Sequence, residues 1–503
     1  MKKIISRLIY IIPAVAIQIL WYMIILDLLR DYIVPISFIL SALSVVFVLY
    51  IIYKRGESAY KILWIIVILT LPLLGALLYI GFGDKISSMP IKLKLERVKK
   101  ASGFRFKDCS ELFCRLKNED KRASQSFEYV YKATEFPLVR NSECKYYPLG
   151  DDMFPDMCEA LESAEKYIFA EYFIIGEGVF WDKISEILVR KAKAGVDVRL
   201  IYDDVGCLST FSKINELKLR ENGVECIAFN PLNFLKARLN NRDHRKILVI
   251  DGKVVFSGGI NLADEYINKN QRFGHWKDIG FRITGESAVS YTYMFAELWN
   301  AYSHRKIPPE LFKSAGSPAA GDDGYVLSYC DSPFNTDAVS NNLIMDILSQ
   351  AEDYAWFYTP YLILGENLLD SFVRTAKRGV DVRIIMPGIP DKKLVFRLSR
   401  SYYPQLLEAG VKIYEYNPGF VHAKACLCDD KLALLGTVNL DYRSLFLHFE
   451  CSSLMYKSRI IPELKSDFIQ TLSRCTERTT ETEKKGIFYR LFSCILRVFA
   501  PLI

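Results

Sequence analysis

The chain has 503 residues, of which 51% are hydrophobic, and a formal net charge of +7. This length is sufficient for two or three domains, and the modest positive charge favours anionic partners without choosing between lipid and nucleic acid. The twelve cysteines are scattered and include no paired C-x2-C sites. This argues against a disulfide framework and indicates a catalytic part that faces a reducing compartment.

Three stretches without charge, residues 8–26, 32–53 and 62–83, occupy the start of the chain. Each is long enough to cross about 30 Å of hydrocarbon, so we predict a transmembrane region over residues 1–83 with two or three spans. Buried core helices are the alternative, although three such runs exceed the needs of an ordinary core.

Basic residues lie on both sides of these stretches and cannot all face the cytoplasm if every stretch spans the membrane. From the cysteine usage and the basic run that follows residue 84, we place the catalytic part on the cytoplasmic side of a cell membrane. Residues 84–135 form a basic amphipathic segment and a linker. Within it, residues 91–107 suit either a helix against anionic headgroups or a solvated linker, and residues 108–135 suggest a helical connection.

From residue 136 the pattern alternates strands and helices, and the order occurs twice. A strand at 167–175, a helix over 184–194 and a buried strand at 195–202 are repeated by a strand at 355–363, a helix through Lys377 and a strand at 379–385. This pattern predicts an α/β fold of two similar lobes, residues 136–315 and 316–503, which together form one pseudo-twofold catalytic domain.

Residues 244–261 and 422–439 align without a gap and keep His, Lys, Asp, Gly and Asn at the same offsets. The chain has only five histidines, so chance would rarely place two of them at the head of matching blocks. A surface hairpin with incidental charges can explain either copy alone but not the pair. We interpret the two blocks as a duplicated catalytic hairpin.

The spacing within the first block places His244 and Lys246 on one face of a strand. The Asp251-Gly252 pair predicts a two-residue turn that puts Gly259 opposite His244, where a glycine would let a substrate oxygen approach the backbone. Asn261 adds an amide donor. An imidazole, a cation and neutral donors together suit a phosphate, and Asp251 at the turn suits an orienting or ionic role.

The motif H-x-K-x4-D followed by G-G or G-T and x-N, present twice, resembles that of the phospholipase D superfamily. Together with the proline and glycine spacing of residues 64–83, it resembles the bacterial cardiolipin synthases. The resemblance implies the catalytic residues His244, Lys246, Asp251, His422, Lys424 and Asp429. It also implies the substrate-binding residues Gly259, Asn261, Thr437 and Asn439, and two acids, Asp278 and Glu450, that pair with the catalytic histidines.

In such a site one neutral histidine attacks phosphorus while the other, protonated, donates to the leaving alkoxide. The lysines and asparagines stabilise charge on the nonbridging oxygens. The resemblance implies that His244 is the nucleophile and His422 the acid and base, whereas the residues alone treat the two as equivalent. We predict no metal and no cofactor, and activity that survives chelators.

The function implied by the resemblance is phosphatidyl transfer between two phosphatidylglycerol molecules in an anionic membrane, giving cardiolipin and glycerol. The alternatives are a phospholipase D-like hydrolase, a transferase that uses another alcohol, and a membrane-bound scaffold without chemistry. The two intact motifs argue against the scaffold. Nucleic acid is not an expected partner, because the membrane region places the site at lipid, and the sequence does not predict an oligomeric state.

Three further features admit two interpretations. The loop before His244 carries Lys236, Arg238 and Arg242, which either line an entrance for an anionic head or form a solvated loop. We expect structural or surface roles for His275, His304 and His448. Residues 484–503 are amphipathic and either lie on a membrane, close over the lobe or pack into its core.

Overall fold

The computed structural model describes residues 13, 15–24, 33–54, 56–83, 89–231, 240–313, 323–483 and 486–502. It contains two compact units. One comprises the chain up to Met89 with Val498–Pro501, and the other comprises Pro90–Arg497 with the last two residues.

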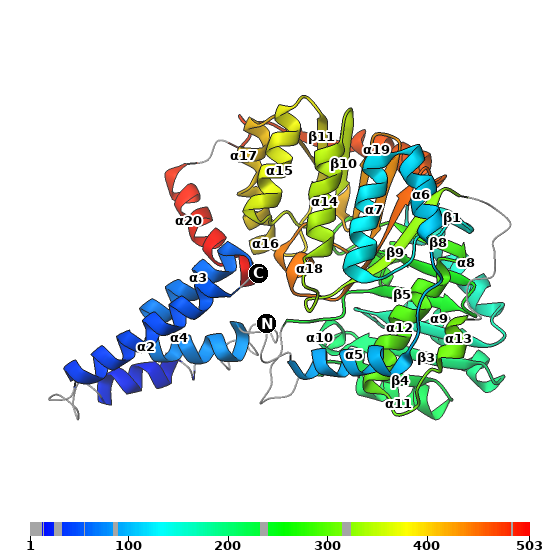
Figure 1. Ribbon diagram of the computed structural model, residues 1–503, viewed down its shortest axis with the longest axis horizontal. Helices are drawn as coiled ribbons and strands as arrows, with labels where there is room; N and C mark the ends of the chain where they lie inside the picture. Colours follow the sequence, from blue (N-terminus) through cyan, green and yellow to red (C-terminus); the bar gives the residue numbers. More distant parts are fainter. Residues whose placement is uncertain are drawn as a thin grey trace. The chain divides into compact units, whose positions relative to one another are not determined.

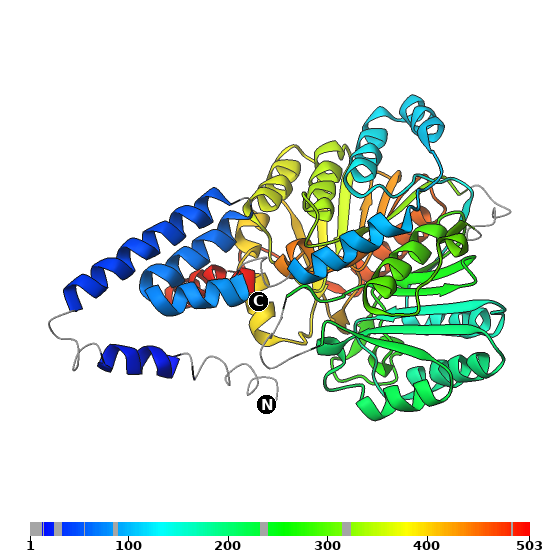
Figure 2. The ribbon, with the colours of Figure 1, turned by 60° about the horizontal axis from the view of Figure 1, so that its bottom comes forward.

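The amino-terminal unit contains helices α2 (Ile33–Tyr53), α3 (Ser58–Thr70) and α4 (Pro72–Leu78), followed by a π-helical turn, η2 (Tyr79–Gly83). Figures 1 and 2 show these helices in dark blue, lying side by side. A small core of Ile51, Trp64, Ile68 and Tyr79 joins them. The continuous span predicted over residues 62–83 is therefore three pieces, because Pro72 has no N–H to continue α3.

Within the described ranges, none of the helices combines the length and the apolar composition that crossing a membrane requires. Residues 8–12, 14, 25 and 26 of the first predicted span lie outside the described residues.

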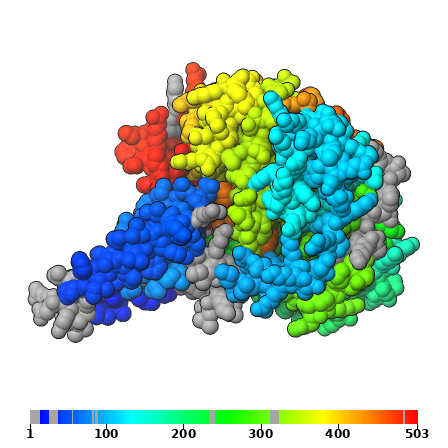
Figure 3. Space-filling view, viewed as in Figure 1, coloured from blue at the N-terminus to red at the C-terminus, as the bar shows by residue number. Residues whose placement is uncertain are grey.

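The segment that leads into the first lobe is helical, as predicted for residues 108–135, and it belongs to the larger unit. It consists of α5 (Met89–Ser102), α6 (Ser110–Glu119) and α7 (Lys121–Thr134). The Asp120 side chain caps α7 by accepting hydrogen bonds from the N–H groups of Arg122 and Ala123. Helix α7 packs on strand β9 and helix α14 of the second lobe, and Figure 3 shows this segment in cyan on the surface of the unit.

The first lobe is an α/β layer structure. Its elements are β1 (Ser142–Tyr147), α8 (Gly150–Glu162), β2 (Tyr167–Tyr172), α9 (Val179–Lys193), β3 (Asp197–Asp203), α10 (Asp204–Cys207), α11 (Lys213–Glu221), β4 (Glu225–Phe229), β5 (Lys246–Ile250), β6 (Val254–Gly258), η4 (Asp264–Ile267), β7 (His275–Lys277), β8 (Gly280–Gly285), α12 (Ala288–Tyr302) and α13 (Pro309–Lys313).

The second lobe repeats this order. Its elements are β9 (Tyr325–Asp331), α14 (Val339–Gln350), β10 (Tyr354–Tyr358), α15 (Glu366–Lys377), β11 (Asp381–Pro387), α16 (Lys393–Arg400), α17 (Tyr403–Glu408), β12 (Lys412–Tyr416), β13 (Gly419–Val421), β14 (Ala425–Cys428), β15 (Leu432–Gly436), α18 (Tyr442–Phe446), β16 (Glu450–Tyr456), α19 (Ile460–Leu472) and β17 (Cys475–Arg478).

The two sheets share one topology. The first has the strand order β1-β8-β6-β5-β2-β3-β4, and the second has β9-β16-β15-β14-β10-β11-β12 with β17 added at its edge. Helix α12 contacts five strands of its own sheet and also β9, while α19 contacts four strands of its own sheet and also β1. The lobes therefore pack through equivalent helices, and their sheets meet at β6 and β15. Figure 1 shows the two sheets one above the other.

The chain ends with α20 (Ile487–Val498) and the short η5 (Ala500–Leu502). One side of α20 rests on the second lobe, where Arg397 lies over the rings of Tyr489 and Phe492. Another side leaves Ile487 and Phe488 exposed. The predicted amphipathic helix is therefore present, and residues 484 and 485 within the predicted range lie outside the described residues.

Candidate active site

The two motif hairpins are β5–β6 and β14–β15, at equivalent positions near the centre of each sheet. Ile250 pairs with Val254, and Cys428 pairs with Leu432, so each loop has three residues rather than the two that we predicted. Asp251 and Gly252 both adopt left-handed backbone angles, with φ of 53° and 65°. The longer loop shifts the register by one residue, and the predicted pairing of Gly259 with His244 is wrong.

The motif aspartates lie at these turns, at the far end of the strand from the histidines. Asp251 accepts hydrogen bonds from three consecutive N–H groups, those of Glu165, Lys166 and Tyr167, at 2.7–2.9 Å. Asp429 accepts the same three bonds from residues 352–354, at 2.7–2.9 Å. Each aspartate fixes the entry into the neighbouring strand, β2 or β10. This placement agrees with the orienting role that the position of Asp251 at the turn suggested.

The two motif histidines pair with carboxylates of the opposite lobe. Both carboxylate oxygens of Glu450 lie 3.0 Å from Nδ1 of His244. Oδ2 of Asp278 lies 2.6 Å from Nδ1 of His422. A carboxylate that accepts the Nδ1 proton fixes the tautomer in which Nε2 carries the lone pair. Each imidazole therefore presents a basic Nε2 to the space between the lobes.

Backbone pairing between the lobes produces this crossing. Strand β13, just before His422, pairs in parallel with β7, just before Asp278. The matching bridge on the other side joins Asp243 to Phe449. The N–H groups of His244 and His422 donate to the carbonyls of Phe449 and Lys277, at 2.9 and 2.7 Å. The position of each histidine is thus determined by a strand of the other lobe.

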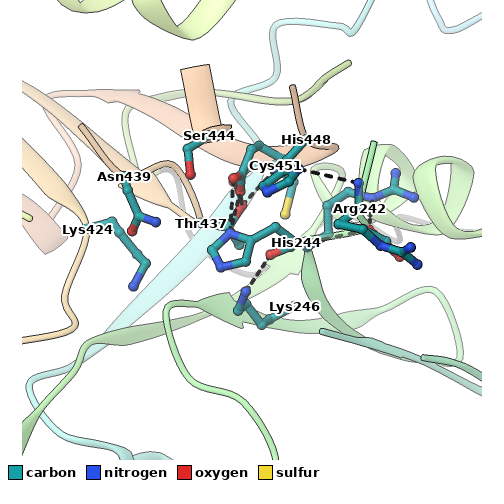
Figure 4. Close-up of polar contacts among 12 residues, drawn as sticks. Arg242, His244, Lys246, Lys424, Thr437, Asn439, Ser444, His448 and Cys451 are labelled. Atoms are coloured by element: carbon teal, nitrogen blue, oxygen red, sulfur yellow. Dashed lines mark hydrogen bonds and ion pairs between the residues drawn. The ribbon is translucent and has the colours of Figure 1, made fainter. Parts of the chain in front are cut away.

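Two buried lysines supply positive charge to the same space. Lys246 and Lys424 are 1% and 2% exposed, and each donates a hydrogen bond to the carbonyl of the histidine two residues before it. Burial lowers the pKa of Lys246 to about 8 and that of Lys424 to about 7. Figure 4 shows both side chains near His244. An anionic ligand bound beside the two lysines would favour their charged form.

The same burial keeps the imidazoles neutral. The pKa of His422 is lowered to about 4, first by burial and then by Lys424. The pKa of His244 is lowered well below its usual value, first by burial and then by Lys246 and Lys424. At pH 7 both histidines therefore lack a charge until an anion enters between them.

Gly259 and Thr437 occupy equivalent positions beside the two carboxylates. A Cβ atom at Gly259 would collide with Oδ1 of Asp278, whereas the hydroxyl of Thr437 donates to Oε2 of Glu450. The close approach at Gly259 is made by the carboxylate of Asp278. This corrects the expectation that a substrate oxygen takes that place.

The motif asparagines are held by their own lobes. Asn261 accepts from the N–H of Ile174 at 3.0 Å and donates to the hydroxyl of Tyr266 at 2.7 Å. Asn439 donates to Asp441 at 3.1 Å, and its buried Oδ1 has no partner among the described residues. Each amide thus has one N–H committed and one N–H still available for a phosphate oxygen.

Sequence analysis missed the aromatic rings around the histidines. The His448 ring lies 6.4 Å from that of His244, and the Trp276 ring lies 5.4 Å from that of His422. Both residues come two positions before the pairing carboxylate, Glu450 or Asp278. That shared offset is visible in the sequence once the repeats are aligned, and it would have brought His448 into the site.

Arg242 does not line an entrance. It is 1% exposed and forms an ion pair with Asp203 at 2.9 Å. Its side chain also donates to the carbonyls of Phe229 and Asn230. Both expectations for Arg242, an entrance cation and a solvated one, are wrong, and Lys236 and Arg238 lie outside the described residues. In the part of the chain that the structure describes, no group of three or more His, Cys, Asp or Glu side chains could hold a metal ion.

Comparison with known proteins identifies the family. The family model described as "Cardiolipin synthase, PLD-like domain" matches residues 157–296 and 344–472, more than half of the chain. The chain belongs to this family. A second model, "Phospholipase_D-nuclease N-terminal", matches residues 42–83.

Curated relatives of this cardiolipin synthase family resemble the chain over most of its length. An uncharacterized protein of Streptococcus mutans is 42% identical over 91% of this chain and 99% of its own. A cardiolipin synthase of Alkalihalophilus pseudofirmus is 34% identical over 94% of this chain and 95% of its own. The crystal structure of a phosphatidylserine synthase from Haemophilus influenzae superposes with a TM-score of 0.58 at 16% identity, over 76% of this chain and 98% of that one. This last likeness shows the shared fold.

Proposed function

We propose that this protein is a membrane-associated phosphatidyltransferase that converts two phosphatidylglycerol molecules into cardiolipin and glycerol through a phosphohistidine. The single observation that supports it most is the crossed pair of imidazoles, each with its Nδ1 on a carboxylate, beside two buried lysines. Cardiolipin synthase relatives that match nearly the whole chain support the choice of substrate.

In the first half-reaction, Nε2 of one histidine attacks the phosphorus of phosphatidylglycerol and forms a P–N bond. The P–O bond to the glycerol headgroup breaks, and the other histidine, protonated at Nε2, gives its proton to the departing glycerol oxygen. Following the family resemblance, we assign the attack to His244 and the proton transfer to His422. Lys246, Lys424, Asn261 and Asn439 stabilise the charge on the nonbridging oxygens.

In the second half-reaction, the headgroup hydroxyl of another phosphatidylglycerol replaces the histidine. His422, now neutral, takes the proton of that hydroxyl as its oxygen bonds to phosphorus, and the P–N bond to His244 breaks. The net reaction releases one glycerol and forms one cardiolipin, and the protonation states of both histidines return to their starting point.

The amino-terminal unit supports association with lipid. On α2, Phe38 and Leu49 are 74% and 60% exposed, and other large apolar side chains of this helix are exposed as well. Removing such side chains from water favours insertion into a bilayer. We therefore propose that this unit attaches the enzyme to the cell membrane with the catalytic unit on the cytoplasmic side.

Purified protein in vesicles of phosphatidylglycerol, labelled in the headgroup glycerol, tests the proposal. The expected products are a four-chain lipid and free labelled glycerol in equal amounts. Release of glycerol with phosphatidic acid would instead indicate hydrolysis, and absence of turnover would indicate a scaffold. His304→Ala, at an exposed histidine outside the site, serves as the control for His244→Ala and His422→Ala, each of which is expected to abolish turnover.

A further inference from the structure

The two half-sites differ at one equivalent position. His448 precedes Glu450 by two residues, and Trp276 precedes Asp278 by two residues. Their rings are tilted by similar angles, 36° and 40°, against the imidazole with which that carboxylate pairs. Both side chains are buried, at 8% and 6% exposure. The pseudo-twofold arrangement thus places a second imidazole beside His244 where the other half-site has an indole.

The orientation of the His448 ring is fixed by the backbone. Its Nδ1 accepts a hydrogen bond from the N–H of Arg242 at 3.4 Å. Arg242 is itself held by its buried ion pair with Asp203. Burial, followed by Arg443 and Arg242, lowers the pKa of His448 well below its usual value, so the ring is neutral. A neutral imidazole whose Nδ1 accepts a hydrogen bond carries its own proton on Nε2.

The ring that carries this Nε2–H group lies next to the ring of His244, with 6.4 Å between the two centroids. A donor beside a reacting imidazole is suited to an oxygen of a bound phosphodiester. Figure 4 shows His448 and His244 together, with Lys246 on the other side of His244.

We propose that His448 is a substrate-positioning residue whose Nε2–H donates to a nonbridging oxygen of the phosphodiester held beside His244. The inference rests on the proposed function, because it assumes that a phosphodiester binds between the two motif histidines. Trp276 supports it from the other half-site. Its indole N–H is buried beside His422 without a hydrogen-bond partner among the described residues.

Two amide substitutions separate the nitrogens of His448. Glutamine places its amide nitrogen near the position of Nε2, whereas asparagine reaches only the position of Nδ1. If His448 binds substrate, His448→Gln retains function and His448→Asn loses it. If the ring only accepts the N–H of Arg242, the order is reversed. His448→Phe keeps the ring shape and removes both nitrogens.

Phosphate binding can be measured without the lipid. Inorganic phosphate is added to the full-length protein in detergent, and the increase in the temperature of thermal unfolding reports binding. We expect His448→Phe and His448→Asn to weaken phosphate binding about tenfold, the loss of one hydrogen bond. His448→Gln is expected to stay within about threefold of the wild type. KM for phosphatidylglycerol should rise in the same order, with a smaller change in kcat.

Equal phosphate binding in wild type and His448→Phe would overturn the proposal, as would tighter binding by His448→Asn than by His448→Gln, or no phosphate binding by the wild type. If His448→Gln fails to fold, the comparison between wild type and His448→Phe decides. If the wild type and the His448 variants bind phosphate in the expected order but the wild type makes no cardiolipin, the proposed function is contradicted and this inference stands.

Discussion

Glu450 and His244 lie 206 positions apart and in different lobes, yet both oxygens of the carboxylate are 3.0 Å from Nδ1 of the imidazole. The reciprocal contact joins Asp278 to His422 at 2.6 Å. Neither lobe therefore contains a complete half-site. Each supplies the imidazole and lysine of one half-site and the carboxylate that orients the imidazole of the other.

Glu450→Gln should test whether the Glu450 carboxylate sets the tautomer of the His244 imidazole. The glutamine amide keeps the shape of the carboxylate but can donate to Nδ1 of His244, which moves the imidazole proton to Nε2 and removes the nucleophilic lone pair. We expect kcat to fall by about 10³–10⁴, as when a triad aspartate is replaced by its amide. The melting temperature should not fall, because a buried carboxyl group is removed.

Steady-state kinetics of cardiolipin formation measures this effect. Glu297→Gln, at another glutamate whose pKa is raised by burial, on α12, is the matched control and should retain activity. A Glu450→Gln enzyme with kcat within tenfold of the wild type would show that the carboxylate does not set the tautomer.

Lys424→Met should increase the stability of the folded protein and lower its activity. Burial lowers the pKa of Lys424 to about 7, below the unfolded value of about 10.4. Below pH 7 the lysine is charged in both states, and burying that charge lowers the stability of the folded protein. Methionine removes this penalty, and we expect a gain of about 2 kcal/mol at pH 6 that shrinks as the pH rises toward 10.

The same variant loses a cation beside the phosphate, so kcat/KM should fall by about 10²–10³. Chemical denaturation and kinetics measure the two effects on one protein. Lys253→Met, at an exposed lysine of the β5–β6 loop, should change neither. Lower stability of Lys424→Met at pH 6 would contradict the assignment of Lys424 as a buried charge.

The pH dependence of kcat/KM should differ from that of two ordinary imidazoles. In the free protein His422 has a pKa of about 4, and the lysines titrate at about 7 and 8. As the pH falls from about 8 to about 5, the lysines gain their charge and the fraction of His422 that can donate a proton increases. We therefore expect kcat/KM to rise over this range.

Unperturbed histidines would instead give a decline below about pH 6.5. Initial rates at subsaturating phosphatidylglycerol, measured in vesicles of constant composition, distinguish the two profiles. A maximum centred near pH 6.5 would indicate that the imidazoles are not depressed in the free enzyme.

Sequence alone predicted the repeated α/β order and the two hairpins, because each depends on local periodicity and on a duplicated motif. It did not predict which carboxylate meets which histidine, since that depends on strand pairing between β7 and β13 across the lobes. The left-handed angles of Asp251 and Gly252 lengthened the loop beyond the expected two residues. Arg242 was misplaced because its buried partner, Asp203, is distant in sequence.

Chelators should leave activity unchanged. In the proposed mechanism Lys246 and Lys424 provide the positive charge that stabilises the phosphoryl oxygens, so no divalent cation is required. Turnover in excess EDTA, after dialysis against the chelator, should match that of untreated enzyme, with vesicle integrity verified separately. Loss of turnover that is restored by one added divalent cation would contradict this expectation.

Asp251→Asn should reduce stability and leave the chemistry intact. Asparagine tolerates the left-handed backbone at this position but replaces a carboxylate that accepts three N–H bonds from Glu165, Lys166 and Tyr167. We expect a loss of about 1–2 kcal/mol in the free energy of unfolding, with kcat per folded molecule within about twofold of the wild type. Asp429→Asn should behave alike, because Asp429 makes the same three bonds in the second lobe. Thermal unfolding and kinetics on the same preparation measure both quantities, and a collapse of kcat without a change in melting temperature would return the two aspartates to the reacting groups.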